Sequence, residues 1–109
     1  MSEYQNRAVE LMQTLIGNQS TADINDRRNA FIFRAIGLYQ ALGGDPESVQ
    51  GVVEKVYAVR APRIDAAVGD LMYNLAGVGH ASDLDIIQAA YNKLDQAVQS
   101  AVPLKRART

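Results

Sequence analysis

The sequence predicts an all-α protein, a bundle of four to five helices formed by a single domain over residues 1–102. Two observations indicate this class. Apolar residues recur every three to four positions along the chain, and short clusters of Gly, Pro, Asn and Asp separate these stretches. A chain of 109 residues fits one domain, and roughly half of its residues are apolar, so a core can form. Because the core of so short a chain is small, we expect oligomerisation to complete the bundle.

The first helix is expected over residues 3–16, followed by Gly17 and Asn18, which tolerate the left-handed conformation at a helix C-terminus. Its apolar residues repeat at helical spacing and therefore share one face. They are Tyr4, Ala8, Leu11, Met12 and Leu15.

The second helix is expected over residues 22–42, after a weak capping pair formed by Ser20 and Asp23. Its middle, residues 30–39, is apolar on almost all sides, which is typical of a helix buried by several neighbours or by a partner subunit. Gly37 lies inside this helix and indicates close helix packing, since Gly costs a helix about 1 kcal/mol relative to Ala.

The third helix is expected over residues 46–59. Gly43 and Gly44 end the second helix, and Asp45 followed by Pro46 is the usual pair at a helix start. The apolar stripe has helical rather than alternating spacing, although it is rich in β-branched residues. It consists of Val49, Val52, Val53, Val56 and Tyr57.

Pro62 separates the third helix from the fourth, which is expected over residues 63–78. Its apolar residues lie on one face, from Ile64 to Leu75. A loop is predicted at residues 79–81, and its His80 is interpreted as solvated.

The fifth helix is expected over residues 83–101, because Ser82 and Asp85 form the best capping pair of the sequence. Pro103 is expected to end this helix. The basic tail, residues 103–109, is then predicted to be disordered and to lie outside the domain.

Composition excludes several classes of protein. The net charge of −1 provides no basic field, so a nucleic-acid partner is not expected. The chain has no Cys, which excludes disulfides and thiolate metal sites. No apolar run reaches the roughly 18 residues that cross a membrane, and the N-terminus is polar, so we expect a cytoplasmic protein without membrane contact.

Residue types also limit the possible chemistry. One His and no Cys leave no recognisable catalytic triad, and the sequence has no Gly-rich phosphate loop. A magnesium site needs converging carboxylates, which on a helix means a spacing of three or four. Asp65 and Asp70 are five apart, and Glu47 and Glu54 are seven apart. We therefore expect no catalytic residue, no metal site and no cofactor.

Three segments between residues 30 and 96 nevertheless follow one another in the order of a known sequence pattern. Residues 31–43, FIFRAIGLYQALG, are similar to a Phe-x-Glu-Glu-Ala-x-Glu-Leu-x-Gln-Ala-x-Gly helix. Residues 53–62 end in VYAVRAP, like a Val-Tyr-x-Arg-Pro element. Residues 67–76 are similar to a Glu-x-x-Asp helix that a loop and a DLDIIQAA helix follow. In this order and spacing the chain resembles the MazG-like family of all-α nucleoside triphosphate pyrophosphohydrolases.

The resemblance implies a fold whose two acidic pairs hold Mg²⁺ ions that polarise a triphosphate and activate water. The first pair corresponds to Arg34 and Gly37, and the second to Ala67 and Asp70. Only Asp70 keeps an acid, so catalysis is in doubt while the fold is not. Arg34 is expected to pair with Asp70, to bind an anionic group, or to lie on an exposed helix edge.

The leading hypothesis is a non-catalytic MazG-like protein that binds or sequesters a nucleotide-like phosphorylated ligand or a protein partner. Small divergent proteins of this kind are common in phage and mobile elements. The candidate ligand contacts are Arg34, Lys55, Arg60, Arg63, Asp70 and Asn74. The resemblance also implies a homo-oligomer, dimer or tetramer, whose candidate interface residues are Phe31, Phe33, Ile36, Tyr39 and Met72.

Two alternatives stay open. The first is a pure protein-interaction or inhibitor module whose former cleft is filled by Phe33, Met72 and Tyr73, whereas a binding site would leave Arg34 and Asn74 lining a cavity. The second is a surviving pyrophosphohydrolase that requires Mg²⁺ as cofactor and uses shifted acids. These acids would be Glu54, Asp65 and Asp70.

Overall fold

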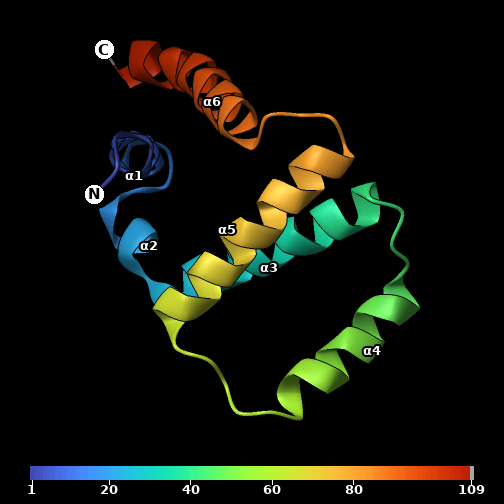
Figure 1. The fold of residues 1–109 in the computed structure, drawn as a ribbon. Helices are drawn as coiled ribbons and strands as arrows, with labels where there is room; N and C mark the ends of the chain where they lie inside the picture. The colour runs from blue at the N-terminus through green and yellow to red at the C-terminus, as the bar shows by residue number, and fades with distance from the viewer. Residues whose placement is uncertain (109) are drawn as a thin grey trace.

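The computed structural model describes the backbone of residues 1–108 and the side chains of residues 1–100. Throughout this part of the chain every regular element is a helix, which confirms the all-α prediction (Figure 1). Residues 1–108 form six helices rather than four to five. In order they are α1 (Glu3–Ile16), α2 (Asn18–Ala22), α3 (Ile24–Ala41), α4 (Pro46–Tyr57), α5 (Ile64–Ala81) and α6 (Ile86–Arg108). None of the described helices is long and apolar enough to cross a membrane.

The start of α3 differs from the prediction because an additional helix, α2, precedes it. Asp23 is the N-cap of α3, and its carboxylate accepts hydrogen bonds from the backbone N–H groups of Asn25 and Asp26. Ser20, which was expected to take part in the cap, instead donates its hydroxyl to the Asp26 carboxylate at 2.8 Å. The helix therefore begins two residues later than expected.

The boundary between α3 and α4 confirms the predicted cap. Asp45 accepts a hydrogen bond from the backbone N–H of Ser48 at 2.8 Å, and Pro46 is the first helical residue. The same contact lowers the pKa of the Asp45 carboxyl below its ordinary value of 3.8, because the hydrogen bond from the Ser48 backbone stabilises the charged form.

The loop predicted at residues 79–81 is wrong, because α5 continues to Ala81. The chain turns immediately afterwards, where Asp83 has a positive φ of 54°. The N–H of Leu84 donates back to the carbonyl of Gly79 at 3.0 Å, which closes the end of α5. His80 is exposed as expected, but on the last turn of a helix.

The end of α6 also differs, since its helical backbone passes Pro103 and reaches Arg108. Its start lies at Ile86, three residues later than expected, because Asp85 itself is the cap and Ser82 instead ends α5. The Asp85 carboxylate accepts hydrogen bonds from the N–H groups of Ile87 and Gln88, both at 2.9 Å. The predicted disordered tail, residues 103–109, falls on residues whose side chains lie outside the described part of the chain.

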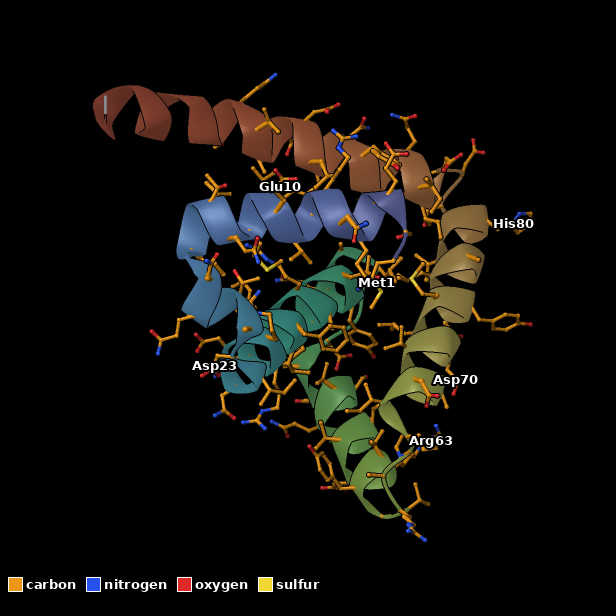
Figure 2. All side chains as sticks on the ribbon, turned by 90° about the vertical axis from the view of Figure 1, so that its left-hand side faces the viewer. Met1, Glu10, Asp23, Arg63, Asp70 and His80 are labelled. Carbon is orange, nitrogen blue, oxygen red and sulfur yellow. The ribbon has the colours of Figure 1, made fainter. Side chains whose placement is uncertain are left out.

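The core of the single chain lies between α1 and α6, the blue and red-brown helices that run side by side in Figure 2. Leu94 is the buried hydrophobic residue of this contact, at 5% exposure. Nearby, the rings of Tyr4 and Tyr91 meet edge to face with centroids 5.4 Å apart, and the Arg7 guanidinium lies 5.5 Å from the Tyr91 ring centre. Residues from the two ends of the sequence thus form the one well-packed region within residues 1–100.

The other half of the molecule is open. The helix pairs in extensive contact are α1–α2, α1–α6, α2–α3 and α5–α6, so α4 packs on no neighbour to a similar extent. The radius of gyration is 16.3 Å, compared with about 13 Å for a compact domain of this length. The closed bundle that the apolar periodicity predicts is therefore not completed within one chain.

Candidate binding surface

The six predicted ligand contacts lie along α3, α4, α5 and the connection between α4 and α5, and all six are exposed. None of them lines the grooves between α3 and α4, whose walls are described below. The set consists of Arg34, Lys55, Arg60, Arg63, Asp70 and Asn74. Within one chain these residues do not converge on a common cavity.

Arg34 does not pair with Asp70, which was one of its three expected roles. Its guanidinium carbon lies 5.4 Å from the centre of the neighbouring Phe33 ring, in a cation–π contact on the outside of α3. Because Phe33 is itself 71% exposed, both groups remain accessible.

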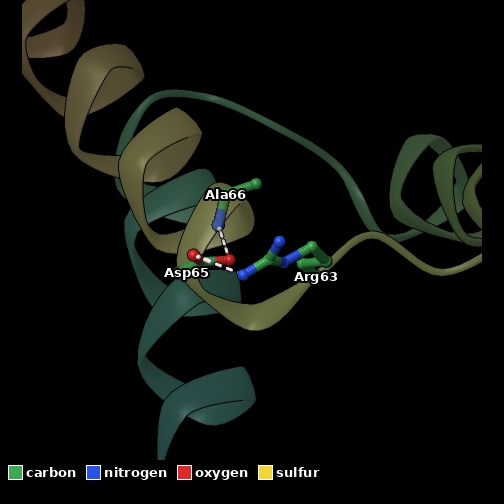
Figure 3. A network of polar contacts seen from close by, with 3 residues as sticks. All are labelled: Arg63, Asp65 and Ala66. Atoms are coloured by element: carbon green, nitrogen blue, oxygen red, sulfur yellow. Dashed lines mark hydrogen bonds and ion pairs between the residues drawn. The ribbon is translucent and has the colours of Figure 1, made fainter.

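The ion pair found within residues 1–100 joins Arg63 and Asp65, at the start of α5 (Figure 3). The Arg63 Nη2 atom lies 3.1 Å from Asp65 Oδ2, and the second carboxylate oxygen accepts from the backbone N–H of Ala66 at 2.9 Å. The two side chains are 84% and 71% exposed, so the pair stabilises the chain little. The ion pair and the hydrogen bond from Ala66 together hold the Asp65 carboxylate at the N-terminus of α5.

Asp70 and His80 both lie on the outside of α5, away from the other helices (Figure 2). The side-chain amide of Asn74 donates to the backbone carbonyl of Asp70 at 2.8 Å, so Asn74 is occupied by its own helix. The acids of the hydrolase alternative, among them Glu54, are not brought together: across residues 1–100 no group of three His, Asp or Glu side chains could hold a metal ion.

Apolar residues, by contrast, do converge. A groove of about 340 Å³ between α3 and α4 is walled by aliphatic and tyrosine side chains alone. Its residues are Ile32, Ala35, Ile36, Tyr39, Val49, Val52, Val53, Val56 and Tyr57. A second groove adjoins it at the α3–α4 turn, where the Tyr39 ring occupies the space that a side chain on Gly44 would need.

Two of the five predicted interface residues line this groove. Ile36 and Tyr39 line the α3–α4 groove, while Phe31, Phe33 and Met72 are 53%, 71% and 47% exposed on α3 and α5. The valine stripe of α4 also lines the groove, although it was not among the predicted interface residues; its helical spacing is plain in the sequence. We call the nine side chains that line the α3–α4 groove, from Ile32 to Tyr57, the apolar face.

The arrangement matches neither form expected for the former cleft. Phe33, Met72 and Tyr73 are not packed inward, since Tyr73 is 82% exposed, and Arg34 and Asn74 do not line the α3–α4 grooves. Comparisons with protein-family models, curated proteins and solved structures found no match.

Proposed function

We propose that this chain is a non-catalytic MazG-like helical protein and that it acts by binding a protein partner. The observation that carries this proposal is the apolar face, whose Ile32, Val52 and Val56 side chains are 50%, 51% and 55% exposed. Monomeric proteins rarely expose a contiguous apolar patch above a few hundred Å², and larger patches mark interaction sites.

The residues at the four acid positions of the resemblance support binding without turnover. Arg34, Gly37 and Ala67 replace three acids, and Asp70 alone remains. A triphosphate substrate needs divalent ions held by several carboxylates, and one carboxylate cannot hold them.

A second candidate function is the sequestration of a nucleotide-like phosphorylated ligand, favoured by the state of Arg34. This guanidinium is exposed, and within residues 1–100 it forms no ion pair. Lys55 and Arg60 are exposed in the same way. Guanidinium and ammonium groups without carboxylate partners are available to phosphate.

A thermal-shift screen with a nucleotide panel, with and without Mg²⁺, distinguishes a nucleotide-like ligand from a protein partner. A nucleotide present at a hundred times its Kd stabilises the folded state by about 2.7 kcal/mol, which raises the melting temperature by about 10 °C. If Arg34 binds phosphate, Arg34→Ala removes this shift. Arg28→Ala is the matched control, since Arg28 lies on the same helix and donates to Asn25 instead.

Turnover is measured in the same samples as release of pyrophosphate. We expect no turnover, and the absence of any nucleotide shift would support the protein partner. Mg²⁺-dependent hydrolysis that Asp70→Ala abolishes would refute the non-catalytic proposal and establish the hydrolase alternative.

A further inference from the structure

A half-buried arginine between α1 and α3 is poorly satisfied by the groups around it. The Nη1 atom of Arg27 donates a hydrogen bond to the thioether sulfur of Met12 at 2.9 Å. The Nε atom of the same guanidinium is buried and has no hydrogen-bond partner. Because buried polar atoms in folded proteins are almost always hydrogen-bonded, this guanidinium lacks an acceptor that its surroundings should supply.

The acidic side chains closest to Arg27 in the sequence are engaged elsewhere. Asp23 accepts hydrogen bonds from two N–H groups at the start of α3, and Asp26 accepts the hydroxyl of Ser20. Within residues 1–100 Arg27 takes part in no ion pair. The acceptor that the guanidinium does have is a thioether, which is weak compared with a carboxylate.

Met12 differs from the other two methionines of the chain. Met1 and Met72 are 94% and 47% exposed, and across residues 1–100 only the Met12 sulfur accepts a hydrogen bond. Met12 is half-buried and lines the groove of about 230 Å³ that also contains Leu94. Its side chain is therefore partly accessible to a small oxidant, although a charged group lies directly beside it.

Oxidation of Met12 would create the acceptor that Arg27 lacks. A hydroperoxide transfers one oxygen atom to a thioether: the sulfur lone pair forms the new S–O bond, and the O–O bond breaks. The sulfur is oxidised by two electrons, and the peroxide leaves as water or an alcohol. The sulfoxide oxygen is a polar acceptor bonded to an atom that Arg27 already contacts. A hydrogen bond with a charged donor is roughly twice as strong as one between neutral groups.

We propose that Met12 is a site of oxidation to methionine sulfoxide by hydroperoxides, and that Arg27 binds the sulfoxide oxygen and so strengthens the contact between α1 and α3. In most cores a methionine sulfoxide weakens the fold, because a polar group replaces an apolar one. The sign is reversed here, since the adjoining guanidinium is short of an acceptor. Neither residue lines the α3–α4 groove, so the inference is independent of the proposed function.

The first test compares the stability of the folded chain before and after treatment with hydrogen peroxide. The Met72→Leu variant is used, so that oxidation of Met72 contributes nothing. Trypsin places Met1, Met12 and Met72 in different peptides, and mass spectrometry of these peptides measures conversion at each methionine. We expect conversion at Met12 and a rise of about tenfold in the folding equilibrium constant from urea unfolding, as one hydrogen bond to a charged group provides.

Two further variants assign this rise to Arg27. In an Arg27→Leu chain the sulfoxide finds no guanidinium, and we expect oxidation to lower the folding equilibrium constant. Arg28→Leu is the matched control, because Arg28 is the next residue on α3 and donates to Asn25 instead. Oxidation should stabilise the Arg28→Leu chain as it does the parent.

The second test needs no Arg27 variant, and it therefore decides the question if Arg27→Leu does not fold. Met12→Gln places an amide oxygen near the position of the sulfoxide oxygen, whereas Met12→Leu provides no acceptor. We expect the Met12→Gln chain to unfold at a higher urea concentration than the Met12→Leu chain. The same pair of substitutions at Met72, which is 47% exposed and accepts no hydrogen bond within residues 1–100, should show no such advantage for Gln.

Three results would overturn the inference. The first is a folded chain in which Met1 and Met72 are fully oxidised while Met12 remains a thioether. The second is a Met12 sulfoxide that lowers the folding equilibrium constant or leaves it unchanged. The third is an equal gain on oxidation in the Arg27→Leu chain, which would show that the guanidinium is not the group that binds the sulfoxide.

Discussion

Replacing Leu94 by Ala is expected to remove a large part of the stability that one chain has by itself. Leu94 is the hydrophobic residue that α1 and α6 bury between them, at 5% exposure. Deleting a buried Leu side chain beyond Cβ costs both its transfer free energy and the cavity that it leaves, in total 2–5 kcal/mol.

The surroundings of Leu94 place the expected cost in the lower half of that range. A groove of about 230 Å³ adjoins it, lined by Leu11 and Leu15 among others, so these neighbours have room to shift into the vacated space. We expect a loss of about 2–3 kcal/mol, which is a substantial share of the 5–15 kcal/mol typical of small domains.

Urea unfolding followed by far-ultraviolet circular dichroism measures this loss, at one fixed protein concentration so that self-association contributes equally. Val98→Ala is the matched control, because Val98 lies on the same helix but is 45% exposed. We expect its effect to stay within about 0.5 kcal/mol. A cost below about 1 kcal/mol for Leu94→Ala, or an equal cost for Val98→Ala, would show that the α1–α6 contact is not the core.

Three further predictions follow from local geometry. Gly79→Ala should destabilise the fold by about 1–3 kcal/mol in urea unfolding, because the new Cβ would lie 2.7 Å from Ile86 Cγ2; an unchanged midpoint would contradict this packing. Gly37→Ala should instead raise the free energy of unfolding by up to about 1 kcal/mol, because no atom beyond the backbone of its own helix turn lies within 4 Å of the added Cβ. A loss of stability would mean that another helix approaches there. The lowered pKa of Asp45 means that its charged cap on the N–H of Ser48 stabilises the fold above pH 3.8, and that this stabilisation is lost as the pH falls further. Melting curves of wild type and Asp45→Asn should therefore converge at acid pH, and a constant difference would refute the role of the charge.

Some features of the fold are predictable because they depend on residues close in sequence. The end of α1 at Gly17, with a φ of 88°, and the start of α4 at Asp45 and Pro46 follow from backbone conformation and short-range hydrogen bonds. The replacement of three acids in the MazG-like pattern is equally readable from the chain. Predicting these features does not require knowing which helices are in contact.

Other predictions were wrong. Residues 79–81 suit a turn as well as a helix, and in the structure α5 continues to Ala81 before the chain turns at Asp83. The candidate ligand residues could be placed on helices, but their separation depends on how α3, α4 and α5 are arranged.

The sequence by itself therefore determined the helical class, some helix ends and the apolar stripes, since hydrogen bonds and side-chain periodicity act within a turn or two of helix. Only the tertiary structure decided which stripes are covered. Of these, the α1–α6 stripe is buried around Leu94, whereas the equally apolar stripes of α3, α4 and α5 remain open. Periodicity shows which face of a helix is apolar. Whether that face is buried depends on residues far along the chain or on another molecule.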